Sequence, residues 1–196
     1  KNHNYLHNHT RMWFASIWIF TLGLPWQLGA EFFMKYLFDG DSASNTLGWK
    51  WVAGIQSKGK HYIASEWNIK KFSNNRFNNI KLNENPVPVI DDRSYSITQN
   101  AFLNANLSNC HDLLIFENNL HFEQSNFKDQ SFKNIYFVLN RNKTRQIKLD
   151  EKVLNFKRSL INNQIEDLKN KSLNCKMINI QDLKNMKENL LALYPS

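Results

Sequence analysis

Residues 26–51 read WQLGAEFFMKYLFDGDSASNTLGWKW, and the first part of the chain is organised around this stretch. An apolar segment runs into a DGD turn, in which Asp39 and Asp41 flank Gly40, and Trp49 and Trp51 follow after one short segment. A buried polar group without a partner costs about 1–3 kcal/mol, so two acids in an apolar neighbourhood require donors. The stretch therefore predicts a polar site within a helical core, and a bound cofactor is one source of those donors.

Amino-acid usage divides the chain into two parts. All six tryptophans lie between Trp13 and Trp67, and residues 1–83 carry ten Lys and Arg against four Asp and Glu. Residues 84–196 carry fifteen against thirteen. Clustered positive charge in the first part favours a polyanionic partner such as DNA, although a solvated basic surface is the plain alternative. With 196 residues, the chain is long enough to bury a core in one large or two small domains.

Cysteine usage and hydropathy favour an intracellular, cytoplasmic protein. Cys110 and Cys175 form no metal-binding spacing, and His3 and His7 have no carboxylate or cysteine beside them, so no metal site is expected. The longest apolar run, residues 12–26, is interrupted by glycine and proline and falls short of the roughly 18–20 residues of a membrane span. No secretory signal is recognisable, and the start without methionine indicates a fragment or a processed piece.

Hydrophobic periodicity predicts helices in the first part of the chain, at residues 11–20, 27–38 and 42–52. The first segment is apolar nearly all round and is expected to be buried on most sides, ending at Gly23 and Pro25. Residues 65–83 are rich in Asn, Lys and Ser and are predicted to be irregular. Residues 84–100, with Pro86 and Pro88, are predicted to form a linker.

The last part of the chain, residues 101–196, has the pattern of a small α/β domain. Strands are predicted at residues 112–116, 134–139 and 175–180, and helices at residues 151–173 and 182–194. Alternating strands and helices indicate a βαβ-type unit with a parallel sheet, so the chain as a whole is α+β. No glycine-rich phosphate loop follows these strands, and a structural role or a surface for a protein partner is expected.

Three segments of the first part occur in a fixed order: HNHTRMWFAS at residues 7–16, PWQLGAEFFM at residues 25–34 and DGDSASNTLGWKWVAG at residues 39–54. In order and spacing they resemble the C-terminal part of the flavin-binding helical domain of the photolyase/cryptochrome family, over roughly residues 6–77. The resemblance implies a partial, all-α FAD-binding domain over residues 1–83, with FAD as its cofactor.

The resemblance also implies which side chains line the flavin site: Asn8, Arg11, Asp39, Asp41 and Asn45. In the family, the two acids bond around the isoalloxazine and ribityl portion and hold the arginine. The asparagine matched by Asn45 faces the flavin N5, where an amide donates as well as accepts without adding negative charge. Such groups tune which redox state of the flavin is favoured.

Tryptophans matched by the resemblance have two roles in the family. Trp49 and Trp26 match the first two members of an electron-transfer chain, so Trp49, Trp26 and Asn45 are the expected catalytic residues. Trp51 matches a tryptophan that stacks on the flipped-out lesion, and Met12 matches a methionine of the lesion pocket. Without the order of the motifs, the same residues would be read as ordinary core.

DNA contacts are expected from His9, Lys50, Lys58 and Lys60. His9 stands where many photolyases have an arginine near the DNA backbone, and Ala64 stands where a second arginine is common, so the phosphate contacts differ from the family pattern. Each lysine taken alone would be interpreted as a solvated surface charge.

These features predict a complete protein that is a monomeric, FAD-dependent pyrimidine-dimer photolyase, a light-driven lyase that repairs DNA. Family segments that would precede Lys1, among them the flavin-phosphate loop and the last tryptophan of the electron chain, are expected to be missing from this chain. One alternative is a cryptochrome-like blue-light photoreceptor that signals to a partner through its α/β part. Another is a non-catalytic remnant that binds DNA, with the chain inactive by itself.

Overall fold

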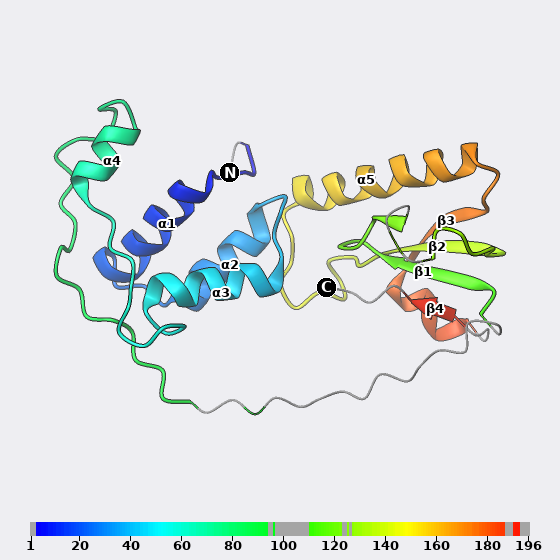
Figure 1. Ribbon diagram of the computed structural model, residues 1–196, viewed down its shortest axis with the longest axis horizontal. Coiled ribbons are helices and arrows are strands. Elements are labelled where there is room, and N and C mark those ends of the chain that lie inside the picture. The colour runs from blue at the N-terminus through cyan, green and yellow to red at the C-terminus, as the bar shows by residue number, and fades with distance from the viewer. Residues whose placement is uncertain are drawn as a thin grey trace. The chain divides into compact units, whose positions relative to one another are not determined.

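The computed structural model describes residues 3–93, 96, 110–122, 125, 127–186 and 190–192. The chain divides into two compact units, residues 1–97 and residues 98–196 (Figure 1). The first unit is helical and the second contains the sheet, which confirms the α+β class predicted from the sequence. No helix in the described part of the chain is long and apolar enough to cross a membrane.

The helical unit is built from four α-helices and a π-helical turn. They are α1 (Asn8–Ser16), η1 (Ile17–Thr21), α2 (Trp26–Tyr36), α3 (Ser42–Ala53) and α4 (Glu66–Phe72). The helices α1, α2 and α3 meet in a core rich in aromatic rings, in which Phe33 and Trp49 are buried. The α3 helix ends at Gly54, whose φ of 83° is the left-handed conformation that favours glycine at a helix C-terminus.

The first helix is less buried than its composition predicts. Over residues 11–20 only Ala15, Ser16 and Ile19 are buried, and the other side chains are half-buried. The prediction of burial on most sides is therefore wrong, because α1 packs mainly on α3 and η1 on α2, which cover only part of the circumference of this segment.

The α4 helix lies within residues predicted to be irregular. Ser65 caps it, since its Oγ accepts a hydrogen bond from the Asn68 backbone N–H at 3.4 Å, and Ile69 is its buried residue. A helix of seven residues with one buried apolar position has no periodicity strong enough to be recognised in the sequence.

Part of the segment predicted as a linker packs on the helical unit. The backbone N–H of Val89 donates to the Ala53 carbonyl at 3.0 Å. Asn83, the residue just before this segment, bonds to the end of η1 at Phe20 and Thr21. Residues 94, 95 and 97–100 of the predicted linker lie outside the described residues.

The second unit is a four-stranded, fully parallel sheet with the order β3-β2-β1-β4. Its elements are β1 (Asp112–Phe116), β2 (Asn134–Leu139), α5 (Glu151–Asn170), β3 (Cys175–Asn179), the 3-10 helix η4 (Ile180–Asn185) and β4 (Leu190–Ala192). The first three strands lie where the apolar runs predict them.

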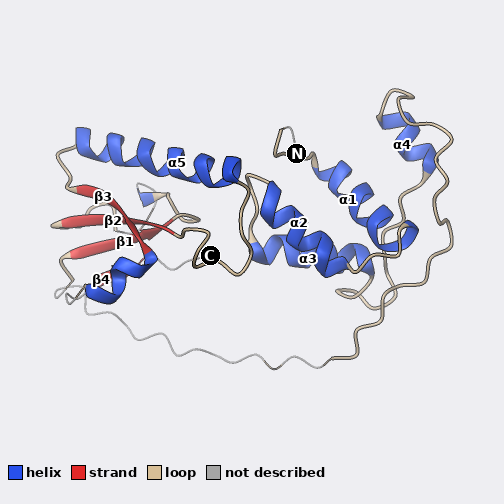
Figure 2. Ribbon diagram, turned by 180° about the vertical axis from the view of Figure 1, so that it is seen from behind, coloured by secondary structure: helices blue, strands red, loops and turns tan. Residues whose placement is uncertain are grey.

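Both faces of this sheet are covered, as a parallel sheet requires. Figure 2 shows α5 along one face, where Ile161 and Leu168 pack against β1 and β2 residues such as Ile115 and Phe137. On the other face, Leu183 and Met186 pack against Tyr136 and Val138. Cys110 and Cys175 form no disulfide with one another, and burial raises the pKa of the Cys175 thiol.

The helix predicted at residues 182–194 is wrong. The chain instead forms η4, which begins at a capping box in which the Asp182 carboxylate accepts from the Asn179 N–H at 2.8 Å, and then enters β4. Leu190, Leu191 and Ala192 pair with β1, so an apolar segment that would suit a helix by itself completes the sheet. Residues 187–189, 193 and 194 of the predicted helix lie outside the described residues.

Candidate cofactor site

A cavity of about 390 Å³ opens between α1, α2 and α3 of the helical unit. It is lined by Asn8, Arg11, Met12, Ala15, Phe33, Leu37, Asp39, Gly40, Asp41, Ser44, Asn45, Gly48, Trp49, Trp51 and Val52. All five side chains expected at a flavin are among them, together with Met12, Trp49 and Trp51. Its volume lies within the range of small-molecule pockets.

A fixed guanidinium stands at one side of the cavity. Arg11 Nη2 donates to both carboxylate oxygens of Asp39, at 3.0 and 2.8 Å, and Arg11 Nε donates to the Leu6 carbonyl at 2.7 Å. The guanidinium carbon also lies 5.4 Å from the ring centroid of Tyr5. Three separate contacts hold the charge in place, so little conformational entropy remains to be lost when it binds a ligand.

Asp41 belongs to the frame of the cavity as well as to its lining. Its Oδ1 accepts the Ser44 backbone N–H at 2.7 Å and caps the first turn of α3. That hydrogen bond is the main reason that the pKa of Asp41 lies below its ordinary value. The carboxylate is therefore ionised at neutral pH and orients the helix that carries Asn45 and Trp49.

Asn45 and Asn8 supply amides from two different helices. Asn45 Nδ2 donates to the Ala30 carbonyl of α2 at 2.8 Å, which fixes the amide plane across the α2–α3 contact. Asn8 is exposed, and its Nδ2 lies 3.9 Å from the Met12 sulfur. One amide is thus held rigidly by the fold, whereas the other has only a weak acceptor among the described residues.

Trp49 forms the apolar wall of the cavity. It is 2% exposed and meets Phe33, Phe14 and Trp18 in edge-on contacts with ring centroids 5.1, 6.3 and 6.3 Å apart. A Cβ added at Gly29 would overlap its six-membered ring, so α2 runs directly against the indole. Its Nε1 is buried and has no hydrogen-bond partner within the described part of the chain.

Trp26 is buried in the same core as Trp49, but no ring contact joins the two indoles among the residues that the structure describes. The indole that touches Trp49 is Trp18, whose Nε1 donates to the Pro25 carbonyl at 3.0 Å. Sequence reasoning missed Trp18 because its contact with α3 spans about thirty residues and follows no local pattern.

Trp51 and Met12 both lie at the cavity. The Trp51 indole is 41% exposed and stacks on Tyr62, with centroids 5.8 Å apart and planes inclined by 24°. Tyr62 comes from the segment after α3 and was not singled out by any motif. Burial raises the pKa of its hydroxyl. Trp51 is thus partly exposed, packs on a second ring and belongs to the cavity lining.

The four expected DNA contacts lie outside the cavity lining. Lys50 Nζ lies 5.9 Å from the Trp26 ring centroid, and Lys58 and Lys60 are exposed in the turn after α3. His9 is half-buried between two rings, with centroids 5.0 Å from Trp13 and 5.3 Å from Phe72. These residues are therefore placed around the helical unit and not in one cluster.

The chemistry and shape of the cavity fit a flavin ring system. Guanidinium, carboxylate and amide groups provide donors and acceptors around an apolar wall, and Gly48 leaves room, since a Cβ there would meet no atom within 4 Å. Ser44 and Gly48 also line the cavity, and no motif in the sequence singled them out. No cluster of metal-binding side chains occurs among the described residues.

Known proteins resemble the first part of the chain. Residues 1–93 match the family model described as the FAD binding domain of DNA photolyase. The deoxyribodipyrimidine photo-lyase of Streptomyces griseus is 48% identical over 50 residues, which cover 26% of this chain and 11% of that protein. Those of Salmonella typhimurium and Buchnera aphidicola are 40% and 37% identical over 59 and 63 residues, covering 30% and 32% of this chain and 12% and 13% of theirs. No solved structure matches the chain.

The family match confirms the resemblance inferred from the three motifs, and FAD is the cofactor that it indicates. The chain spans about an eighth of the length of these relatives, as the matched shares of 11–13% show. The family match ends at residue 93, before the sheet, so it covers the helical unit and not the second unit.

Proposed function

We propose that this chain is part of a pyrimidine-dimer photolyase, an enzyme that uses light and FAD to split cyclobutane dimers in DNA. The observation that supports this most directly is the cavity of the helical unit. It gathers the Arg11–Asp39 pair, Asp41 and two amides against a wall of indoles, within a segment that matches a photolyase FAD-binding domain. When bound, FAD supplies the light absorption and the electron that dimer splitting requires.

Arg11 and Asn45 hold the cofactor and set its charge preference in this proposal. Arg11 is fixed by Asp39 and the Leu6 carbonyl, so its positive charge stabilises negative charge that develops on a ring beside it. Asn45 is fixed by the Ala30 carbonyl and can present its amide without adding a competing charge. Asp41 positions Asn45 by capping α3.

Trp49 is the electron donor closest to the cofactor, because it lines the cavity and is almost fully buried. Two indoles can pass an electron to it: Trp26, which the family pattern indicates, and Trp18, which touches Trp49 edge-on. The contact distance favours Trp18 as an additional step, whereas Trp26 lies beside the cation of Lys50, which disfavours a positive charge on its ring.

Trp51 and Met12 contact the lesion in this proposal. Trp51 is exposed at the cavity and is supported from behind by Tyr62, which suits stacking on a base that has left the duplex. Met12 adds a polarisable apolar surface from α1.

The decisive experiment measures flavin content and repair together. The chain, and a version extended upstream with the native sequence, are purified, and their absorption spectra are compared after incubation with FAD. Arg11→Leu is expected to lower flavin retention at least tenfold, and Lys176→Gln, a charge loss in the second unit, is expected to leave it unchanged.

Absence of bound flavin in both proteins would refute the proposal. If flavin is retained and photoreduced while dimers in an irradiated oligonucleotide persist, a light sensor of the cryptochrome type replaces the repair enzyme. If neither flavin binding nor repair is found but DNA is bound with a strong salt dependence, the chain is a DNA-binding remnant.

A further inference from the structure

The α4 helix is fixed to α1 along one side. Ile69 is 4% exposed, and the Trp13 Nε1 donates to Asn68 Oδ1 at 2.9 Å. The chain that leads into α4 is also tied down, since the Ala64 N–H donates to the buried Ser16 hydroxyl at 2.8 Å. A helix of seven residues held at both its entry and its centre is a rigid support for whatever its other side carries.

The other side of α4 presents aromatic rings to solvent. Trp67 is 65% exposed and Phe72 is 56% exposed. Lys71 Nζ lies 5.1 Å from the centroid of the first ring and 5.5 Å from that of the second, so one cation bridges both. The following turn repeats the pattern, because the Arg76 guanidinium lies 5.5 Å from the ring of the exposed Phe77.

A hollow of about 510 Å³ lies beside these rings and is lined by Trp67, Lys70, Lys71, Asn74 and Asn75. Asn74 and Asn75 both adopt the left-handed conformation, with φ of 53° and 59°. Two consecutive residues of this kind turn the chain sharply and bring two amide side chains to the edge of the hollow. An indole, two ammonium groups and two amides therefore face one space.

Positive charge in this region is available to an external anion. Residues 66–77 contain Lys70, Lys71 and Arg76 against Glu66 alone. Within the described part of the chain, none of the three cations forms an ion pair with a carboxylate. Because Lys71 and Arg76 each lie near an exposed ring, a ligand with both negative charge and a flat apolar surface can contact the cation and the ring together.

We infer that α4 and the turn after it form a binding surface for single-stranded DNA. Lys70, Lys71 and Arg76 contact phosphates, and bases stack on Trp67 and Phe72. Single strands satisfy both demands, because their bases are free to stack whereas those of a duplex are paired. The identity of the nucleic acid rests on the proposed repair function, to which this surface adds a second contact outside the cavity.

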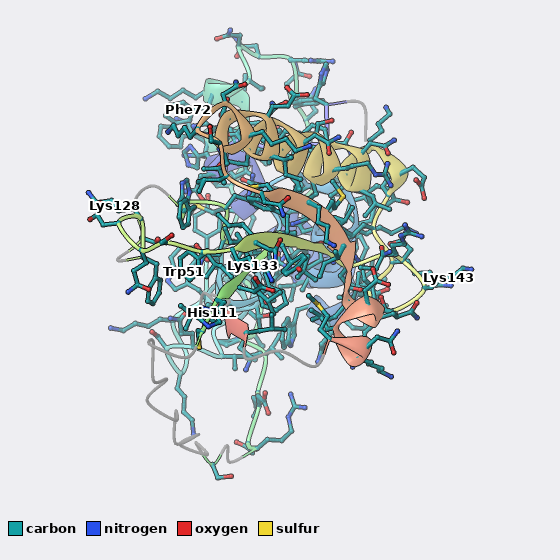
Figure 3. The ribbon with its side chains drawn as sticks, turned by 90° about the vertical axis from the view of Figure 1, so that its right-hand side faces the viewer. Trp51, Phe72, His111, Lys128, Lys133 and Lys143 are labelled. Carbon is teal, nitrogen blue, oxygen red and sulfur yellow. The ribbon has the colours of Figure 1, made fainter. Side chains whose placement is uncertain are left out.

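The surface is connected to the cavity through α1. Phe72 packs against His9 of α1. Two other residues of the same helix, Asn8 and Met12, line the cavity. Both Phe72 of this surface and Trp51 of the cavity are labelled in Figure 3. A strand whose damaged base enters the cavity can thus continue over His9 to α4, which gives His9 a place between two binding surfaces.

Binding of undamaged DNA to the full chain tests this surface separately from repair. The probe is a labelled oligothymidylate of about twelve nucleotides, within the site sizes of single-strand binders. Trp67→Ala is expected to weaken binding roughly ten- to hundredfold through lost stacking. Lys71→Gln is expected to reduce the slope of log affinity against log salt by about 0.7, the loss of one phosphate contact.

Two variants serve as controls. Lys176→Gln removes an exposed lysine that lies over Tyr136 in the second unit, and it should change neither affinity nor salt slope. Trp67→Phe keeps a ring at the same position, so it should retain most of the affinity and lose the quenching of tryptophan fluorescence that stacking produces.

Unchanged affinity in both Trp67→Ala and Lys71→Gln would overturn the inference. Displacement of the oligonucleotide by polyglutamate at equal charge would also overturn it, because that result would reveal a general polyanion surface. A tenfold preference for oligouridylate would overturn it as well, because RNA would then be the ligand. Flavin content is measured on the same preparations. If flavin is retained but Trp67→Ala and Lys71→Gln leave the DNA affinity unchanged, only this inference is refuted. If the two variants weaken DNA binding but neither flavin binding nor repair is found, only the proposed function is refuted.

Discussion

The two units treat their polar side chains in opposite ways. In the sheet unit, buried polar groups are paired with one another: Asp112 accepts from Asn134 at 2.8 Å, and Glu117 receives Arg145 and Lys157. In the helical unit, polar groups converge on a cavity. All four buried side-chain atoms that have no partner in the described residues lie in this unit: Trp49 Nε1 at the cavity, and Asn4 Oδ1 and both ring nitrogens of His61 outside its lining.

Apolar surface shows the same difference. Among the described residues, Phe156 and Leu160 are the two large apolar side chains exposed in the sheet unit, and all the others lie in the helical unit, from Tyr5 to Ile90. Scattered exposed apolar groups are normal, but a concentration with open polar cavities indicates binding surfaces. The described part of the sheet unit thus pairs its buried polar groups and covers most of its apolar side chains, whereas the helical unit leaves both kinds of group open, as expected of surfaces that bind other molecules.

The largest expected effect concerns the independence of the two cores. Phe137 is completely buried between β2 and α5, and Phe137→Ala should cost about 3–5 kcal/mol in the free energy of unfolding. All six tryptophans lie in the helical unit, so fluorescence reports that unit alone. The variant should lower the sheet transition followed by circular dichroism and leave the fluorescence midpoint unchanged. Phe33→Ala is the reciprocal control, and a common shift of both signals would contradict independence.

An internally paired charge should matter more for stability than a charge at the cavity. Glu117→Gln leaves Arg145 and Lys157 without their carboxylate, and these side chains are only 14% and 11% exposed. The expected loss is about 1–3 kcal/mol. Asp39→Asn, at a pair whose side chains are 26% and 50% exposed, should cost at most about 1 kcal/mol and instead lower flavin retention. Urea denaturation and flavin titration of both variants measure this contrast, and equal stability losses would break it.

Crowding at the wall of the cavity should be almost as costly. Gly29→Ala places a methyl group into the ring of Trp49, which Phe14, Phe33 and Trp18 prevent from moving away. Overpacking of this kind costs about 1–3 kcal/mol. The variant should lower the fluorescence midpoint and change the near-ultraviolet circular dichroism of tryptophan. Gly59→Ala, at an open position with positive φ, separates backbone strain from crowding because it should leave the tryptophan spectrum intact.

The smallest effect is a pH-dependent cap. Asp41→Ala should cost about 0.5–2 kcal/mol at neutral pH. Because the pKa of Asp41 is lowered in the folded protein, its contribution is fully present above the ordinary value of 3.8 and is lost as the pH falls through the folded pKa. The difference between wild type and Asp41→Ala, measured by denaturation at several pH values, should therefore shrink below about pH 3.8. An asparagine side chain can cap a helix without ionising. Asp41→Asn should therefore remove the pH dependence and keep most of the stability.

Local sequence predicted the elements that depend on local patterns. The runs DLLIF and NIYFVL became β1 and β2 because continuous apolar runs suit a sheet buried on both faces, and α5 followed from its periodic apolar stripe. The helix predicted over the segment LLA was wrong for a tertiary reason, since the pairing of this segment with β1 outweighs its helix propensity. The α4 helix was missed because its stability comes from Ser65, Asn68 and Trp13 and not from an amphipathic pattern.

The residues that line the cavity were predicted through the resemblance of the motifs to a known family. Such a resemblance indicates which residues, far apart in the sequence, share one site. Arg11 and Asp39, separated by 28 residues, could be paired in advance only in that way. Trp18 and Tyr62 were not predicted, because a ring contact between distant elements produces no recognisable pattern in the local sequence. The roles assigned to Trp26 and Trp49 in electron transfer remain predictions for photoreduction measurements.

The strand order of the sheet has a consequence for synthesis on the ribosome. The contacts of the helical unit described above lie within residues 3–93, so they can form before the strands β1 to β4 are translated. The central strand β1 instead keeps one edge unpaired until Leu190 has emerged, because β4 is its partner there. During that interval the nascent chain carries an apolar strand with free backbone donors and acceptors. Chaperone demand during translation should therefore begin at β1 and end with β4.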